Sequence, residues 1–239
     1  MNIKTVIKPL KKHISEIEKW LIEERNKTGD GFYCNWNIIE NAVKEKRIIV
    51  LTIDDFAIGF IIYRIDEYIS NIDIAEINPK YRKKGYGKKM INDCLNHFKN
   101  QGVLVTELYC EPKSSEKIWK KLDFLNFPKL PHDNNIIRMF RPLVKRLEID
   151  TEINKEDEII ELWNEEPHIA EKISPKWTWK INSLTLEKPI IHPAYQDWQI
   201  CWRKGNIINE TDKVKRFYSK ENKYGHFVII KELKNYKDN

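Results

Sequence analysis

Cysteine is scarce in this chain. The 239 residues include four cysteines, Cys34, Cys94, Cys110 and Cys201. Their spacing matches neither the paired ligands of a zinc site nor the dense framework of a disulfide-rich secreted domain. We therefore expect reduced thiols and no bound metal ion.

Long apolar runs are also missing. Residues 1–9 lack the apolar stretch of a signal peptide, and the longest apolar run, near Phe56, is too short to span a bilayer. We therefore expect a soluble, cytoplasmic protein without a membrane partner.

An excess of positive charge is confined to the N-terminal part. The net charge is +6 at pH 7, with 25 Lys and Arg against 19 Asp and Glu in residues 1–144, and 17 of each in residues 145–239. Five of the basic residues lie between positions 82 and 89. This distribution favours a local phosphate site over an extended nucleic-acid surface, so nucleic acid is the less favoured partner.

The composition is sufficient for a folded core. Hydrophobic residues make up 41% of the chain and aromatic residues 11%, which is not typical of a disordered protein. The length exceeds that of an ordinary single domain. We predict two domains, residues 1–142 and residues 144–239.

The basic loop at residues 82–88, Arg-Lys-Lys-Gly-Tyr-Gly-Lys, is the most informative segment. Gly85 and Gly87 permit backbone angles closed to other residues and let the main chain approach a ligand closely. The helix predicted for residues 88–100 offers unpaired N–H groups and the positive end of its dipole to an anion. The basic loop therefore predicts a site for a cofactor that carries phosphate.

Regular structure is predicted on both sides of the basic loop. Ile53, Asp54 and Asp55 separate two short apolar runs and indicate a hairpin. The predicted strands of this part are residues 47–52, 56–63, 70–77, 103–110 and 135–141. The predicted helices are residues 10–25, 36–44, 88–100 and a segment that opens at Pro112 and ends at Phe124.

In this order of parts the chain resembles the GCN5-related N-acetyltransferase (GNAT) superfamily, whose signature is an R/Q-x-x-G-x-G/A loop between a strand and a helix. A second family motif resembles residues 118–124, Ile-Trp-Lys-Lys-Leu-Asp-Phe. The resemblance covers about residues 1–142. It implies an α/β fold with a mixed central sheet flanked by helices, acetyl-CoA or another acyl-CoA as co-substrate, and an amine as acceptor.

The resemblance also implies which residues contact the cofactor. The backbone of Ile77 would touch the pantetheine arm. The implied contacts are Ile77, Arg82, Lys83, Lys84, Gly85, Tyr86, Gly87, Lys88 and Trp119. Trp119 stands where many family members have a tyrosine that protonates the leaving thiolate, and an indole cannot supply that proton at neutral pH. Either Tyr109 or Tyr86 takes the role, or the thiolate leaves unassisted.

Two carboxylates on the strand before the basic loop are candidates for the general base. Family bases match the positions of Asn71 and Asp73, so Asp73 is the first candidate. Alternation of side chains along a strand places Asn71, Asp73, Ala75 and Ile77 on one face. Glu76 is the second candidate, because a β-bulge would redirect its side chain. For either carboxylate, an ion-paired surface position is the alternative.

Aromatic residues surround the predicted loop between the first two helices. In the family this segment borders the acceptor pocket, which implies that Phe32, Tyr33 and Trp36 contact the acceptor. Packing of the three rings against the core is the alternative.

The C-terminal part lies outside the resemblance, and we predict a small α+β domain of unknown role. Its predicted elements are a helix at residues 154–165 and strands at 198–203, 214–219 and 226–231. It holds five of the eight tryptophans, which indicates either an indole-rich core or an exposed stacking platform.

Three functions are compatible with these features. The first is an N-acyltransferase that acts on an amine of a small molecule or a protein. The second is an acyltransferase that acts on tRNA or DNA. The third is a CoA-binding scaffold with little catalysis.

Overall fold

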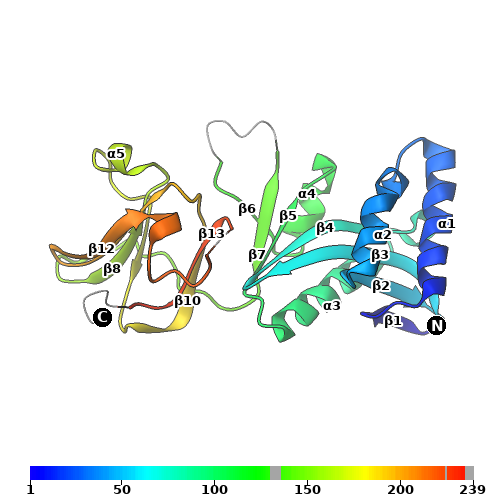
Figure 1. Cartoon of the computed structure of the whole chain (residues 1–239), viewed down its shortest axis with the longest axis horizontal. Coiled ribbons are helices and arrows are strands. Elements are labelled where there is room, and N and C mark those ends of the chain that lie inside the picture. Colours follow the sequence, from blue (N-terminus) through cyan, green and yellow to red (C-terminus); the bar gives the residue numbers. More distant parts are fainter. Residues whose placement is uncertain (130–135, 224, 235–239) are drawn as a thin grey trace. The chain divides into compact units, whose positions relative to one another are not determined.

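The computed structural model describes residues 1–129, 136–223 and 225–234 (Figure 1). They fall into two compact units. The first holds the described residues within 1–126 and 133–143, and the second holds those within 127–132 and 144–239. In the described part of the chain, no helix has both the length and the apolar character needed to cross a membrane.

The first unit is built on a seven-stranded mixed sheet in the order β1-β2-β3-β4-β5-β7-β6. The strands are β1 (Ile3–Val6), β2 (Ile48–Ile53), β3 (Phe56–Asp66), β4 (Ile69–Ile77), β5 (Val105–Tyr109), β6 (Leu125–Asn126) and β7 (Arg138–Pro142). The β4–β5 pair is parallel and the other pairs are antiparallel. The predicted mixed sheet is thus confirmed, although β1 was not predicted and residue 135 of the predicted last strand lies outside the described residues.

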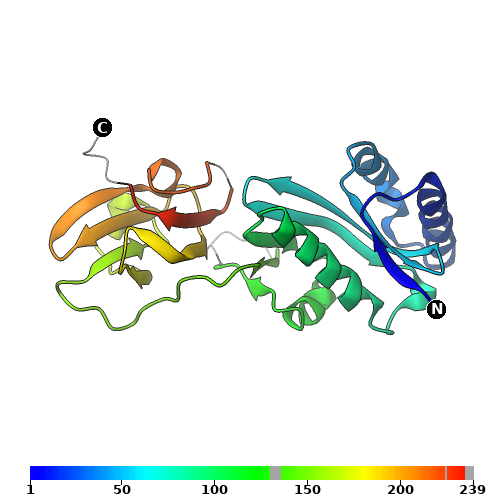
Figure 2. The same ribbon diagram turned by 90° about the horizontal axis from the view of Figure 1, so that it is seen from below.

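Helices cover both faces of this sheet (Figures 1 and 2). The α-helices are α1 (Lys11–Thr28), α2 (Trp36–Lys44), α3 (Tyr86–Asn100) and α4 (Glu116–Lys120), and the short 3-10 turns are η1 (Phe32–Asn35), η2 (Pro79–Tyr81) and η3 (Lys113–Ser115). Ile17 and Leu21 of α1 and Ile39 of α2 pack on one face of the sheet. Residues of α3, such as Met90 and Phe98, pack on the other. The apolar stripes of the helices account for this layering.

The strand β4 contains a bulge at Asp73. Ile62 of β3 pairs with Ile74, and the next residue, Tyr63, pairs with Ile72, so Asp73 has no partner on β3. As a result, Ile72 packs in the same core cluster as Ile77, whereas Ile74 packs in the other. The strict alternation predicted for residues 71–77 is therefore wrong, because the extra residue reverses the facing of the side chains that precede it.

The second unit consists mainly of antiparallel strands. They are β8 (Glu158–Leu162), β9 (Trp177–Lys180), β10 (Thr185–Pro193), β11 (Gln199–Lys204), β12 (Ile207–Lys213) and β13 (Phe227–Glu232). One sheet has the order β12-β11-β8-β9 and the other is the pair β10-β13. Among the described residues of this unit, α5 (Pro167–Ala170) is the only α-helix, and η4 (Val214–Arg216) is a 3-10 turn.

Two secondary-structure predictions for the second unit are wrong. The helix predicted at residues 154–165 is the strand β8, which pairs with both β11 and β9. A short apolar run fits a helix or a buried strand equally well, and pairing with neighbouring strands decides the outcome. The strand predicted at residues 214–219 is η4 followed by irregular backbone.

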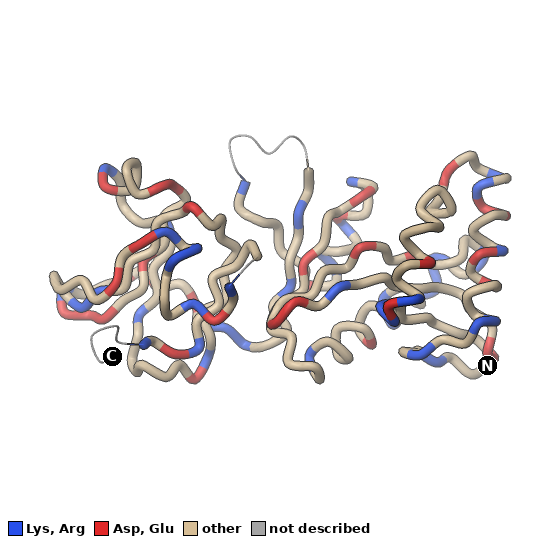
Figure 3. Tube along the Cα trace, in the orientation of Figure 1, with Lys and Arg blue, Asp and Glu red and all other residues tan. Residues whose placement is uncertain are grey.

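Tryptophan side chains form much of the second core. Trp179, Trp198 and Trp202 are 2%, 4% and 2% exposed, and Trp177 stacks on Trp198 with ring centroids 5.6 Å apart. The interpretation as an indole-rich core is therefore confirmed for these rings. Positive and negative side chains are interspersed along both units (Figure 3).

Candidate active site

The parallel strands β4 and β5 separate toward their C-terminal ends. Their pairing runs from Ile69 with Val105 to Ile72 with Leu108 and stops there, although β4 continues to Ile77. Among the described residues, the last part of β4 therefore has no ladder partner on the side of β5. Such a gap exposes main-chain N–H and C=O groups that an extended ligand can bind.

The basic loop follows this gap and leads into α3. Gly85 caps the helix in the left-handed region, with φ of +83°, and Lys83 also has a positive φ, of 62°. The N–H of Lys89 donates to the carbonyl of Gly85, so the N–H groups before it in the first turn have no intrahelical acceptor. Unpaired N–H groups and the positive end of a helix dipole are the features that bind anions at helix starts.

A cavity of about 610 Å³ lies between these elements. It is lined by Phe32, Ala75, Glu76, Ile77, Arg82, Gly87, Lys88, Met90, Ile91, Glu111, Pro112, Ser114, Ser115, Ile118, Trp119, Lys121 and Leu122. The lining joins the end of β4, the start of α3 and the segment from β5 through α4. The structure thus brings together Glu76, Ile77, Arg82, Gly87, Lys88, Trp119 and Phe32 from the sequence-predicted site.

Other predicted residues lie beside the cavity lining. Gly85 takes the positive φ that the turn of the loop requires. The amino group of Lys84 lies 5.7 Å from the centre of the Tyr81 ring. Lys83 is exposed, and Tyr86 packs against Tyr81. For these residues, a contact with the cofactor stays a prediction.

The three aromatic residues predicted for the acceptor separate into two groups. Phe32 lines the cavity. Tyr33 stacks on Trp36 with centroids 6.1 Å apart, and both pack against the core cluster under α1 and α2. For Tyr33 and Trp36 the observed contacts are packing contacts.

Glu76 is held at the cavity by two hydrogen bonds. The Ile77 N–H donates to Glu76 Oε1 at 2.8 Å, and Arg82 Nη2 donates to the same oxygen at 2.9 Å. Burial raises the pKa of Glu76, and the nearby Glu24 carboxylate also raises it, while Arg82 and the Ile77 N–H act in the opposite direction. The net effect is a raised pKa, so the Glu76 carboxylate takes up a proton more readily than an ordinary glutamate does.

Both main-chain groups of Ile77 already have partners within the protein. Its N–H donates to Glu76, and its carbonyl accepts from Arg82 Nε at 2.8 Å. The Ile77 side chain lines the cavity. Contact of the Ile77 backbone with the pantetheine arm stays a prediction.

Asp73, the first candidate for the base, lies in an ion pair outside the cavity lining. Arg64 Nη2 donates to Asp73 Oδ1 at 2.7 Å and Arg64 Nε donates to Oδ2 at 3.0 Å. Arg47 Nη1 lies 4.0 Å from Oδ2. Of the two candidate carboxylates, Glu76 lines the cavity, whereas Asp73, at the bulge, is ion-paired.

Replacing Asp73 by asparagine should change turnover by less than about threefold, because an exposed ion pair contributes little free energy. The pH dependence of kcat/KM should keep its midpoint. Steady-state kinetics of the variant across pH 5–9 measures both quantities. A loss as large as that caused by Glu76→Gln would restore Asp73 as the base.

The second family motif places Trp119 at the cavity. Its ring packs against Phe124 with centroids 5.1 Å apart. Neither Tyr86 nor Tyr109 lines the described cavity, and Arg138 lies over the Tyr109 ring at 5.5 Å. Cys110 is buried, with Sγ 3.3 Å from Ser115 Oγ. For Tyr86 and Tyr109, a role in protonating the leaving thiolate stays a prediction.

Sequence reasoning missed Glu24, which the structure brings to Arg82. Arg82 Nη2 donates to Glu24 Oε1 at 2.6 Å. Glu24 follows Ile17 by seven residues and Leu21 by three, so it continues the apolar stripe of α1. A carboxylate on the buried stripe of a helix is the signal that could have identified it.

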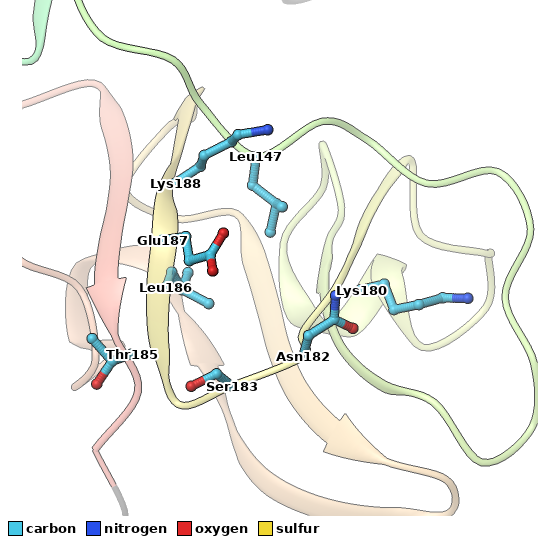
Figure 4. A pocket seen from close by; sticks show the side chains of 8 residues that line it. All are labelled: Leu147, Lys180, Asn182, Ser183, Thr185, Leu186, Glu187 and Lys188. Atoms are coloured by element: carbon cyan, nitrogen blue, oxygen red, sulfur yellow. The ribbon is translucent and has the colours of Figure 1, made fainter.

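Smaller cavities occur among the described residues of the second unit. One, of about 380 Å³, lies beside β10 and is shown in Figure 4, where the amino group of Lys180 points away from the other labelled side chains. Another, of about 560 Å³, lies beside α5 and contains the ion pair of Arg203 with Glu161, 2.7 Å from Nε to Oε2. Cys201 lines it too, and burial raises the pKa of that thiol to about 11, so it stays protonated at neutral pH.

Comparison with solved structures gives matches over the first unit. The chain is similar to PH1933 from Pyrococcus horikoshii OT3 (20% identity, 59% of this chain and 98% of that chain, TM-score 0.48). It is also similar to the PaiA N-acetyltransferase from Thermoplasma acidophilum in complex with coenzyme A (18%, 59% and 99%, 0.47) and to Ard1 from Thermoplasma volcanium (16%, 60% and 98%, 0.46). No curated protein matches the chain.

A comparison with protein-family models identifies the domain in the first unit. The model of the acetyltransferase (GNAT) family matches residues 12–124. This range runs from α1 to the end of the second motif and includes β4, the basic loop and α4. Residues 12–124 therefore form a GNAT acetyltransferase domain.

Proposed function

We propose that the protein transfers an acetyl or similar acyl group from acyl-CoA to an amine of a small molecule or a protein. The observation that carries this proposal is the make-up of one cavity. Its lining combines the basic start of a helix, a half-buried carboxylate of raised pKa and residues from the unpaired part of β4. Each of these features serves a different part of the reaction.

The residues present fit an acyl-CoA. The free N–H groups at the start of α3, with Lys88, would bind the pyrophosphate. The unpaired edge of β4 would hydrogen bond to the amides of the pantetheine arm, as a sheet edge binds an extended peptide. When bound, acyl-CoA supplies the thioester that is attacked.

Glu76 would act as the general base, directly or through a water molecule. It would take the proton that the amine loses as its nitrogen bonds to the acyl carbon and the carbon–sulfur bond breaks. Free main-chain N–H groups of β4 would stabilise the negative charge on the carbonyl oxygen. The apolar lining from Ile77, Met90 and Ile91 would exclude water from the thioester.

Two measurements test this function. Calorimetry should detect CoA binding, and a thiol-reactive dye should detect CoA release from acetyl-CoA in the presence of some members of a panel of primary amines. Lack of CoA binding would contradict the proposal outright. Binding without thiol release for any small amine, protein N-terminus or lysine peptide would instead support the CoA-binding scaffold.

A further inference from the structure

Two carboxylates share one guanidinium nitrogen beside the cavity. Arg82 Nη2 donates to Glu24 Oε1 at 2.6 Å and to Glu76 Oε1 at 2.9 Å. Arg82 Nε is also engaged, because it donates to the carbonyl of Ile77. Arg82 therefore links α1 to the end of β4, and its position depends on both carboxylates.

The Glu24 side chain is the most buried of the three that meet at Arg82. Its side chain is 9% exposed, compared with 17% for Glu76 and 41% for Arg82. Glu24 Oε2 is buried and has no hydrogen-bond partner among the described residues. An unpaired buried carboxylate oxygen is costly, because it has lost its hydrogen bonds to water without gaining another partner. Such a group in a native structure calls for an explanation.

The charges around Glu76 do not balance. Glu24 from α1 and Glu76 from β4 carry two negative charges, and Arg82 supplies one positive charge. The next acid along α1, Glu23, pairs instead with Lys80 at 3.2 Å on the surface. The other charged residues that line the cavity are Lys88, Glu111 and Lys121. Glu24 is thus the acid that faces Glu76 across Arg82.

We propose that Glu24 is a positioning residue of the transfer reaction: through Arg82 it fixes the Glu76 carboxylate at the cavity and sets how readily that carboxylate takes up a proton. This inference rests on the proposed function, because it assumes that Glu76 is the base. Because Glu24 Oε2 has no partner among the described residues, the recorded hydrogen bond of this carboxylate is the one from Arg82, which ties Glu24 to Glu76 through that guanidinium.

The sign of the effect follows from the electrostatics. The negative charge of Glu24 raises the pKa of Glu76. Removing that charge should lower the pKa of Glu76, so the carboxylate becomes ionised at lower pH and becomes a weaker base. In the pH profile of kcat/KM, the midpoint of the acidic limb should move to lower pH, and the plateau should fall by about three- to tenfold.

The test compares Glu24→Gln with Glu23→Gln in the full-length protein. Both variants remove one negative charge from neighbouring positions of α1, but only the first faces Glu76. We expect the midpoint to move to lower pH in Glu24→Gln and to stay in place in Glu23→Gln. An unchanged midpoint in Glu24→Gln, with melting temperature and CoA affinity retained, would overturn the inference.

A second variant covers the case in which Glu24→Gln does not fold. Glu24→Asp keeps the charge but shortens the reach to Arg82, so its midpoint should stay near that of the wild type while kcat/KM falls. A midpoint in Glu24→Asp well below that of the wild type would contradict the inference. Glu76→Gln separates the two proposals: full activity in that variant removes Glu76 as the base, whereas inactivity combined with an unmoved Glu24→Gln midpoint removes only the role of Glu24.

Discussion

Replacing Glu76 by glutamine should lower kcat by about 10²- to 10⁴-fold, the contribution that a general base typically makes. Glutamine keeps the size of the side chain and can still accept the hydrogen bond from Arg82, but it cannot take up a proton. The affinity for CoA should therefore change little. Stopped assays of thiol release measure kcat, and calorimetry measures CoA binding.

The control for Glu76→Gln is Glu111→Gln. Glu111 lies in the segment after β5 and lines the same cavity, but it is exposed. Its replacement should leave kcat within about threefold of the wild type, since a solvated carboxylate gains little from its surroundings. If Glu76→Gln retained more than a tenth of the wild-type kcat, or if both variants lost activity equally, Glu76 would not be the base.

The pH dependence of the wild type gives an independent check on Glu76. Because burial and Glu24 raise the pKa of Glu76, the acidic limb of kcat/KM should lie above the range of an ordinary carboxylate. Activity should be lost as the pH falls through that raised value, because the base becomes protonated.

Replacing Gly87 by valine should weaken CoA binding by about 10- to 100-fold, roughly 1.4–2.7 kcal/mol. Gly87 lies in the first turn of α3, and a Cβ there would meet within the protein only Ile77 Cγ1, at 3.7 Å. The free protein thus has room for a Cβ at this position. The expected loss of CoA affinity arises in the complex, because the valine side chain would prevent the pyrophosphate from approaching the main chain. Calorimetric titration with CoA measures it.

Gly85 should behave differently from Gly87. Its φ of +83° is strained for any residue with a Cβ, although no atom lies within 4 Å of that position. Gly85→Ala should therefore lower the melting temperature as well as the CoA affinity. The control is Gly102→Ala, because Gly102 follows the other end of α3 with φ of +85° and equally open space. The Gly102→Ala variant should have a lower melting temperature but an unchanged affinity for CoA.

For Gly87→Val, an unchanged affinity for CoA would contradict the assignment of the basic loop as the pyrophosphate site.

Features that depend on local sequence were predictable. The bounds predicted for α2 are those observed, and the hairpin at Asp54 and Asp55 has both residues at positive φ. The basic loop was recognisable because its glycines, charges and following helix are adjacent in the chain. These features rest on interactions within a few residues of one another.

Features that depend on contacts between residues far apart in the sequence were harder to predict. The bulge at Asp73 arises from pairing with β3, so the facing of Ile72 could not be obtained from alternation alone. Glu24 and Glu76 are far apart in sequence and meet only through Arg82. The segment of β8 was predicted to be a helix, because its apolar run alone fits either structure. The pairing that makes it a strand involves β9 and β11, which lie later in the chain. In each case tertiary pairing overrides the local pattern.

The early end of the β4–β5 ladder has a consequence for the stability of the protein. The C-terminal part of β4 lacks a strand partner on one side, and unpaired strand edges can pair with another chain when they become accessible. A ligand that binds this edge stabilises the native state by mass action, by about 2.7 kcal/mol at a concentration one hundred times its Kd. Under the proposed function, acyl-CoA would be such a ligand, so its supply would affect the stability of the fold as well as the rate of the reaction.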